Sequence, residues 1–517
     1  MRTNFFPAPG RLAHRASVVA LIATAAALGG ALGGCGSDDA GGGAAPGPTG
    51  GGGTGGEGGT LFGETTSSST SSGTGGGGSV SCDPGATEGP HTWSVNAGDG
   101  AAQLATAVAL DPSGAVVMAG AFAGALTLGG TTLTSLGAND IFVAKLSAAG
   151  APVWALRFGD SADQSARAVA SDAQGNVLVT GRFLGSVNFG GGVFTKPGCC
   201  FNQAFLAKLG PDGAHLWSKS LGNVNDETGR GVAVDAAGNV ALVGEYQTSI
   251  DFGGGVTVTN AGGGTDDAFV ALFNAQGVPQ WARSFGDTMD QSAHAVAFDE
   301  AGNLLVTGEA AGSIDLGAGP LPVTGLKSAF VLKMSPAGAP IWGKLFGANE
   351  AFGEGIAADG QGNVVVAGDH KGEISFGGGT FTTQLDVNAF VVKLDPQGEH
   401  LWSKSFGDNQ AQHARGVGAD GAGRVVVAGD FGGSMDVGGA TLTSAGANDA
   451  FLVKLDTVGC DVWAKAFGDG ASQVANAVSV ASNGAAAVAG RMAGTADFGG
   501  GVKTAAGDDV FVAKLAP

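Results

Sequence analysis

The chain of 517 residues has little charge, a single tyrosine and none of the short motifs that mark common catalytic sites. Charged residues make up 14% of it. No HExxH, GxSxG, CxxC or tandem DxDxDG pattern occurs, so the sequence offers no support for the metal-dependent, nucleophilic or calcium-loop chemistry that those patterns carry. Beyond the N-terminal region, no apolar run is long enough to cross a bilayer, and no segment has convincing helical periodicity.

Basic residues are also scarce. Lys and Arg number 25 against 45 Asp and Glu, which gives a formal charge of −20. Residues 1–34 contain three arginines and no acid, so the remainder carries −20 − 3 = −23. This acidity argues against binding to nucleic acid or docking on anionic lipid. It suits cations, basic partners or plain solubility, and a solvated acidic surface is the simplest interpretation.

The N-terminus has the layout of an export signal. Three arginines precede a stretch of small apolar residues that ends in LGGC at Leu32–Cys35. This ending resembles the bacterial lipobox, and the resemblance implies that a signal peptide, residues 1–34, is removed before a lipidated Cys35. No Asp follows the Cys, so the best-known signal for retention in the inner membrane is missing. We therefore expect an outer-membrane lipoprotein of the bacterial cell envelope, periplasmic or surface-exposed; an ordinary secretion signal with an incidental Cys is the alternative.

Residues 35–85 are expected to form the lipidated Cys and a flexible tether. Gly, Ser and Thr dominate the segment, and almost nothing in it can form a core. The mean reach of about 44 such residues is roughly 35–40 Å. With acyl chains as the only membrane anchor, such a tether would hold a following domain clear of the lipid surface.

Tryptophan marks a repeated unit in the rest of the chain. The seven Trp are separated by 61, 63, 64, 61, 60 and 61 residues, and they stand at Trp93, Trp154, Trp217, Trp281, Trp342, Trp402 and Trp463. A fixed period of this length is typical of repeat architectures. In the second unit, residues rich in Val, Ile, Phe and Trp alternate with Gly, Asp, Asn and Pro turns. This pattern predicts four antiparallel strands, at 166–172, 177–183, 204–209 and 215–222, which is one propeller blade.

The two ends of the repeat region predict how the ring closes. The region begins with a lone outer strand at 91–98 and ends with a third strand at 509–517, so the last unit lacks its own fourth strand. We therefore expect residues 86–517 to form an all-β, seven-bladed β-propeller of four-stranded blades. In it, the N-terminal outer strand completes the last blade and leaves no open edge.

Two stretches resemble a known repeat. The segment GVAVDAAGNVALVGEY at Gly231–Tyr246 and the segment DAFLVKLDTVGCDVWAKAFGD at Asp449–Asp469 are similar to the bacterial seven-bladed β-propeller repeat, which is related to the NHL repeat. The resemblance covers residues 91–517. It implies a secreted or surface protein, and it implies the fold much more firmly than an activity. The sequence departs from the repeat at Leu272 and Phe273, which replace Lys-Leu, and at Ala481, which replaces the turn Asp.

Most repeated residues are interpreted as architecture. The turn Asp is expected to cap its own turn, the Lys of the third strand to pair with an acid between blades, and each Trp to pack between neighbouring blades. The DFGGG stretches are expected to be tight bends.

The residues that vary between units are the candidate site. Those at the start of the inner strand and at the end of the second strand should surround the channel mouth, on the face that carries the long loops. The charged members of the first set are Arg167, Arg230, His294, Glu354 and Arg415. Those of the second set are Arg182, Glu245, Glu309, Asp369, Asp430 and Arg491. They are predicted either to bind a polar ligand, with Tyr246 or His370 as a stacking or donor group, or to form salt bridges between blades.

Acidic loops and cysteines complete the predictions. Calcium at the Gly-Asp loops is the one cofactor we consider, and we otherwise expect none; the aspartates are Asp99, Asp160, Asp287, Asp408 and Asp469, with Asp163, Asp226 and Asp290 nearby. In an exported chain disulfides are expected. We predict Cys82–Cys460 as a staple on the closure, which leaves Cys199 and Cys200, although four cysteines allow three connectivities.

The function expected from these features is binding. We predict a monomeric surface lipoprotein whose propeller binds a protein or a polysaccharide at the envelope. An enzyme at the channel mouth, for which His294 with Glu354 or Glu309 would have to serve as the acid–base pair, and a passive structural component of the envelope are the alternatives.

Overall fold

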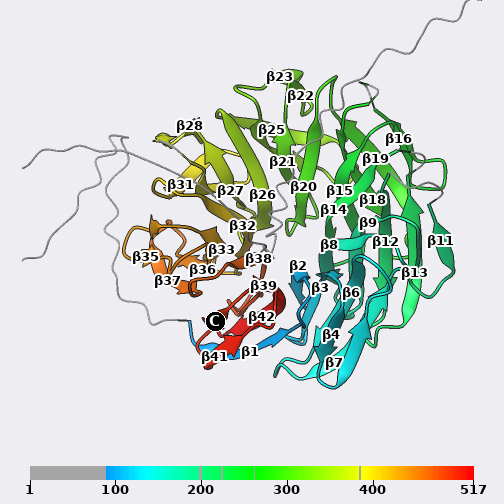
Figure 1. The fold of residues 1–517 in the computed structure, drawn as a ribbon. Coiled ribbons are helices and arrows are strands. Elements are labelled where there is room, and N and C mark those ends of the chain that lie inside the picture. Colours follow the sequence, from blue (N-terminus) through cyan, green and yellow to red (C-terminus); the bar gives the residue numbers. More distant parts are fainter. Residues whose placement is uncertain (1–88, 197–200, 223–224, 261, 263, 384–385) are drawn as a thin grey trace, which may run out of the picture. The chain divides into compact units, whose positions relative to one another are not determined.

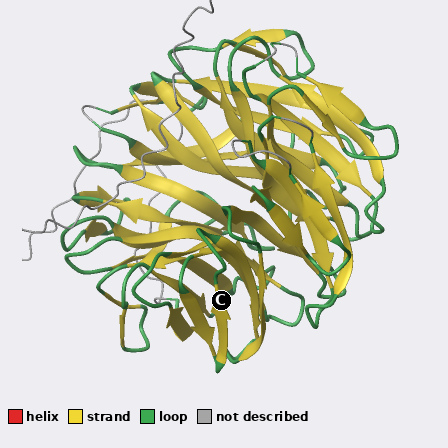
Figure 2. Ribbon diagram, turned by 45° about the vertical axis from the view of Figure 1, so that its right-hand side comes forward, coloured by secondary structure: helices red, strands yellow, loops and turns green. Residues whose placement is uncertain are grey.

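The computed structural model confirms the predicted propeller. It describes residues 89–517 except 197–200, 223–224, 261, 263 and 384–385, and all of these belong to one unit, Ser72–Pro517. Seven four-stranded antiparallel sheets surround a central axis (Figure 1). The described part consists of strands and loops without a helix (Figure 2), and it therefore contains no helix that is long and apolar enough to span a membrane.

Each blade has an inner, a second, a third and an outer strand. The inner strands are β2 (Gln103–Leu110), β8 (Gln164–Ser171), β14 (Glu227–Val234), β20 (Gln291–Phe298), β26 (Glu350–Ala358), β32 (Gln412–Ala419) and β38 (Gln473–Val480). The second strands are β3 (Val116–Phe122), β9 (Val177–Phe183), β15 (Val240–Tyr246), β21 (Leu304–Ala310), β27 (Val364–Lys371), β33 (Val425–Phe431) and β39 (Ala486–Met492).

The third strands are β6 (Asp140–Leu146), β12 (Gln203–Leu209), β18 (Asp267–Phe273), β24 (Ser328–Met334), β30 (Asn388–Leu394), β36 (Asp449–Leu455) and β42 (Asp509–Leu515). The outer strands are β7 (Pro152–Phe158), β13 (His215–Leu221), β19 (Pro279–Phe285), β25 (Pro340–Gly347), β31 (His400–Phe406), β37 (Asp461–Phe467) and β1 (His91–Ala97). The four strands predicted for the second unit therefore match β8, β9, β12 and β13 to within two residues at either end.

The N-terminal strand closes the ring as predicted. The last sheet has the order β1-β42-β39-β38, so its outer strand comes from the start of the described chain (Figure 1). Ser94 lies opposite Ala513 and Val95 opposite Val512. This pairing satisfies the backbone hydrogen-bonding groups that the edge of β42 would otherwise expose.

A two-stranded hairpin between the second and third strands of each blade was not predicted. The seven hairpins are β4–β5 (Ala125–Leu128, Thr131–Thr134), β10–β11 (Ser186–Asn188, Val193–Thr195), β16–β17 (Ser249–Asp251, Thr257–Thr259), β22–β23 (Ser313–Asp315, Pro320–Pro322), β28–β29 (Glu373–Ser375, Thr380–Thr382), β34–β35 (Ser434–Asp436, Thr441–Thr443) and β40–β41 (Thr495–Asp497, Val502–Thr504). The DFGGG bend is the turn of such a hairpin, and apolar residues such as Ile250 and Phe252 are buried beneath it.

The core lies between blades. Phe142 of the first blade, for example, packs in one cluster with Val512 of the last. Six of the seven Trp add a directional contact, because the indole N–H donates to a backbone carbonyl oxygen in the outer turn of the next blade. These bonds are Trp93–Ala148, Trp154–Pro211, Trp217–Ala275, Trp281–Pro336, Trp342–Pro396 and Trp402–Thr457, at 2.9–3.1 Å.

The buried lysines also join blades, as expected. Lys145 Nζ lies 2.9 Å from Asp111 of its own blade and 3.3 Å from the carbonyl oxygen of Gly175 in the next. Lys208, Lys333 and Lys393 form the same ion pair with Asp172, Asp299 and Asp359. The last blade lacks the acid because Ala481 replaces it. There Lys514 bonds to carbonyl oxygens instead, and burial lowers its pKa.

The outer turn must present a glycine to the Trp of the preceding blade. Gly459 has φ +87°, and a Cβ there would lie 2.9 Å from the ring of Trp402. Gly501 has a similar φ of +95°, but a Cβ there would meet nothing within 4 Å.

We expect Gly459→Ala to lower the free energy of unfolding by about 1–3 kcal/mol more than Gly501→Ala does. Both positions have a left-handed backbone, but only an alanine at 459 would overlap a packed ring. Thermal and urea denaturation measure the difference, and equal losses would show that the Trp contact adds nothing.

Candidate functional site

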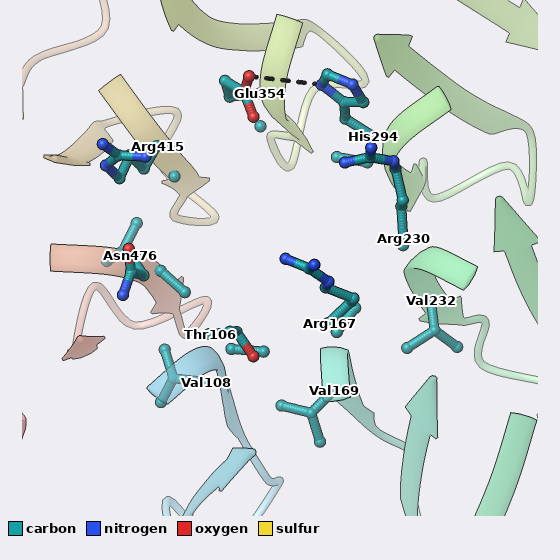
Figure 3. Close-up of a pocket in the computed structure, with 18 of the residues that line it drawn as sticks. Thr106, Val108, Arg167, Val169, Arg230, Val232, His294, Glu354, Arg415 and Asn476 are labelled. Carbon is teal, nitrogen blue, oxygen red and sulfur yellow. Dashed lines mark ion pairs between the residues drawn. The ribbon is translucent and has the colours of Figure 1, made fainter. Parts of the chain in front are cut away.

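The channel mouth is built by a bulge that recurs in every inner strand. Each of the seven strands carries one extra residue relative to its partner, after its third or fourth residue, where the register shifts. The extra residues are Thr106, Arg167, Arg230, His294, Glu354, Arg415 and Asn476. A bulge redirects the side chain of its extra residue. Here it turns one side chain from each blade toward the axis (Figure 3).

These seven residues line a cavity of about 440 Å³. The residues on either side of each bulge are Ala or Gly, which leaves space for the larger side chain between them. The next inward-facing position is aliphatic in every blade and forms the floor of the cavity, with Val108, Val169, Val232, Val296, Ile356, Val417 and Val478. The site is therefore a ring of polar and charged groups above an aliphatic girdle.

The structure separates the two predicted sets. Arg167, Arg230, His294, Glu354 and Arg415 all line the cavity. The second set, on the second strands, lies one strand farther from the axis, opposite the start of the inner strand. Arg182 is there opposite Ser165, Glu245 opposite Thr228, Glu309 opposite Ser292, Asp369 opposite Phe352, Asp430 opposite His413 and Arg491 opposite Val474.

Nine of the eleven predicted residues are engaged in ion pairs. The pairs are Arg230–Glu245 at 2.9 Å, Lys327–Glu309 at 2.7 Å, His294–Glu354 at 3.5 Å, His413–Asp369 at 2.9 Å, Arg491–Asp508 at 3.3 Å, and Arg415–Asp430. Only the two histidine pairs cross between blades; the other four lie within one. For these nine residues, the structure therefore favours the predicted salt-bridge role, although mostly within blades rather than between them.

The two remaining residues, Arg167 and Arg182, have no hydrogen bond or ion pair in the described part of the chain, and the Nε atoms of both are buried without a partner. Burial, and the positive charges of Arg182 and Arg230, lower the pKa of Arg167 to about 10. Arg167 and Arg182 therefore lie beside the cavity with no carboxylate in contact among the described residues, and the nearby charges of Glu245 and Asp163 offset only part of the repulsion.

The predicted ligand groups Tyr246 and His370 do not face the cavity. Both are completely buried, at the end of a second strand where other blades have residues such as Phe122. The Tyr246 hydroxyl donates to Ser284 Oγ at 2.7 Å, and His370 Nε2 lies 2.9 Å from Ser405 Oγ. Burial lowers the pKa of His370 to about 4, so the ring is neutral. Their predicted role in ligand binding is wrong, because the alternation of the strand turns them into the core.

The Gly-Asp loops have a structural role. Asp160 accepts hydrogen bonds from the backbone of Ala162 and Ser186 and from the side chain of Gln164, which ties the loop to the inner strand and the hairpin. These bonds outweigh the effect of burial and lower the pKa of Asp160. Among the described residues, no group of three or more His, Cys, Asp or Glu is arranged to hold a metal ion. Calcium binding stays a prediction.

Sequence reasoning missed some of the ring. Lys327 and Asp508 immediately precede a third strand, and His413 is the second residue of an inner strand. Their positions in the repeat could have identified them, because each lies beside the variable end of a second strand. The aliphatic floor was visible as a Val or Ile two residues after every bulge residue.

Of the predicted cysteines, Cys460 is buried. Cys35, Cys82, Cys199 and Cys200 lie outside the described residues, so the Cys82–Cys460 pairing stays a prediction.

Comparison with known proteins finds relatives of low identity. No protein-family model matches the chain. The uncharacterized WD repeat-containing protein L264 of Acanthamoeba polyphaga mimivirus is 24% identical over 356 residues, which cover 56% of this chain and 26% of the relative. Regulatory protein FlaEY of Caulobacter vibrioides is 25% identical over 272 residues, or 48% of this chain and 28% of the relative. The chain thus matches about a quarter of the length of these relatives.

Solved structures of low identity have a similar arrangement of strands. The WD40 repeats of RRP9 give a TM-score of 0.44 at 10% identity, covering 83% of this chain and 99% of that one. Puromycin hydrolase gives 0.42 at 12% identity, covering 76% and 51%. The strand order itself defines the class: the protein is a seven-bladed β-propeller.

The His294–Glu354 pair predicts a pH dependence. Burial opposes the charged forms of both groups, but their attraction outweighs it: Glu354 raises the pKa of His294 above 6.5, and His294 lowers that of Glu354 from 4.5 to about 2. The histidine contribution to stability is complete below pH 6.5 and is lost as pH rises through the raised value. The glutamate contribution is complete above pH 4.5 and is lost as pH falls toward 2.

We therefore expect His294→Gln to lower the thermal midpoint most between pH 4.5 and 6.5, and progressively less at higher pH. Thermal denaturation of both proteins across this range measures the effect. A difference that stays constant with pH would contradict a charged pair.

Proposed function

We propose that this protein is a binding module of the bacterial cell envelope that recognises a protein partner through the loop face of its propeller. The loop face is the end at which the inner strands begin, and it carries the outer-to-inner and second-to-third connections. The observation that carries the proposal is that this face combines the open polar cavity with exposed large apolar residues. These are Leu136, Phe201, Met289 and Leu326, which are 43–62% exposed.

Such side chains are typical of protein contacts, because aromatic, Met and other large apolar groups supply most of the buried area of an interface. Toward the opposite end, the exposed large apolar residues include Val278 and Val458 in the outer turns and Val153, Leu216, Ile341 and Leu401 at the start of outer strands, at the other end of the blades from the polar cavity.

A polysaccharide is the alternative partner. A sugar ring binds well where an aromatic face is available for stacking, but the residues that line the cavity include no Phe, Tyr or Trp, and Tyr246 is buried elsewhere. This lining supports a protein partner over a polysaccharide at the cavity.

The location rests on the N-terminal sequence. The basic and apolar pattern of residues 1–34, followed by Cys35, supports export, lipidation and attachment to the outer membrane, and residues 35–85 would supply the tether. These segments lie outside the described residues. In an oxidising envelope, a Cys82–Cys460 disulfide would hold the closing region to the sixth blade.

Lipidation can be tested directly. We expect the mature protein to begin at Cys35, to carry the mass of attached acyl chains and to partition into the membrane fraction. Cys35→Ser should remain unlipidated and leave that fraction. Intact-mass analysis and fractionation measure both. A Cys35→Ser protein that is processed and retained like the wild type would indicate another anchor.

The binding face can be tested by photo-crosslinking in the native cell. A photoreactive amino acid at Leu136 or Leu326 should form a discrete crosslinked species with an envelope protein, whereas the same group at Val278 or Val458 should not. Equal crosslinking from both faces would contradict a dedicated loop face. Crosslinking from neither face would favour the passive structural role. Addition of calcium or EDTA in parallel tests the predicted metal dependence.

An enzyme remains an alternative function, but the proposed acid–base pair is engaged. His294 and Glu354 neutralise each other, and Glu309 bonds to Lys327. Turnover of any candidate substrate that is lost in His294→Ala would support this alternative.

A further inference from the structure

We propose that Arg167 and Arg182, with Arg230 beside them, form a binding site for a carboxylate group carried by the protein partner. The inference deepens the proposed function and rests on it. It starts from a comparison of equivalent positions in three blades of the same propeller.

In the third and sixth blades, the bulge residue is an arginine, and the residue fifteen positions later in the second strand is a carboxylate. Arg230 bonds to Glu245 at 2.9 Å, and Arg415 bonds to Asp430. The repeat therefore contains a built arrangement in which the bulge guanidinium binds an oxyanion that the second strand supplies.

The second blade has the same bulge arginine but the opposite charge at the partner position. Arg167 stands where Arg230 and Arg415 stand, and Arg182 stands where Glu245 and Asp430 stand. Neither has a hydrogen bond or ion pair with any described residue, and both leave a buried Nε without an acceptor. In Figure 3 the side chain of Arg167 extends into the cavity. The second blade therefore has the guanidinium donors of this arrangement but no carboxylate to accept their hydrogen bonds.

The charge around this corner is also exceptional. Glu245 contacts Arg230, and the charges of Glu245 and Asp163 act on Arg167, so the three arginines Arg167, Arg182 and Arg230 outnumber these two carboxylates in a protein of net charge −20. Burial and repulsion from its neighbours already lower the pKa of Arg167. A bound anion would relieve this repulsion and satisfy the buried N–H groups.

The guanidinium groups and the aliphatic floor of the cavity together indicate which chemical groups a ligand should have. The planar fork of an arginine matches the two oxygens of a carboxylate. Directly below lie Val169 and Val232, which form part of the aliphatic girdle. A carboxylate attached to an apolar side chain satisfies both surfaces, and the C-terminal residue of a polypeptide has this form. A cavity of about 440 Å³ is large enough for such a chain end.

The test uses the full-length protein and a pair of peptides that differ only at the end. Acetyl-Gly-Ala-Val with a free carboxylate should bind in calorimetry and raise the thermal midpoint, and the corresponding amide should do neither. Arg167→Gln should weaken binding of the acid about tenfold or more. The control Arg424→Gln removes a paired arginine at the opposite end of the inner strands and should bind the acid like the wild type.

The decisive variant is Arg182→Glu, which recreates the third-blade arrangement. It should abolish binding of the acid, because its own carboxylate fills the site, and it should raise the thermal midpoint of the unliganded protein. A raised midpoint excludes misfolding as the reason for lost binding. If Arg182→Glu lowers the midpoint or still binds the acid, the inference fails.

Two further outcomes would overturn it. Equal binding of acid and amide would show that no carboxylate is recognised. Binding of glucuronate without binding of the peptide acid would assign the corner to an anionic sugar. The result for the proposed function is separate: crosslinking from Leu136 that persists in Arg182→Glu, with no peptide binding to the wild type, would leave protein binding standing and remove only the carboxylate site.

Discussion

Closure of the ring is the constraint on which the rest of this structure depends. Seven wedge-shaped blades enclose a channel only if the last blade is completed, and the strand that completes it, β1, comes from the other end of the described chain. Its pairing with β42 covers the edge that this third strand would otherwise expose, and Trp93 on β1 donates to the carbonyl oxygen of Ala148 in the next blade. The same indole contact occurs at six of the seven interfaces between described blades, and it helps to hold neighbouring blades at set positions. The seven bulges can face one axis only because these positions are set.

The bulges convert a symmetric backbone into an asymmetric site. Every inner strand turns one extra side chain toward the axis, whatever that side chain is. All blades have small residues on either side of this side chain and an aliphatic residue two positions later. The backbone around the bulge is therefore the same whichever residue occupies it. Function in such a protein therefore resides in the departures from the repeat. Most of the charged residues at these variable positions neutralise one another in ion pairs. In the second blade, the two variable arginines have no such ion pair among the described residues.

The prediction from sequence was accurate where the relevant physics is local and repeated. The strand at Val177–Phe183 was predicted to the residue, because residues that favour strands lie between two turn segments. The hairpins were missed because each strand has only three or four residues, too few for alternation to be recognised. Tyr246 and His370 were assigned to the mouth because they follow its charged residues, yet a shift of one residue in a strand reverses the face.

The sequence by itself therefore determined the blade count, the closure and the positions that surround the channel, because a period of about 61 residues and the place of each Trp survive without any long-range information. Only the tertiary structure decided which charges meet. Arg230 and Arg167 occupy equivalent positions in the repeat, but Arg230 contacts a carboxylate, whereas Arg167 is repelled by the positive charge of Arg182. The difference depends on which residue of the second strand lies beside each bulge. Electrostatic interaction falls off with distance, so the pairing, unlike the period, is set by atomic positions in the folded ring.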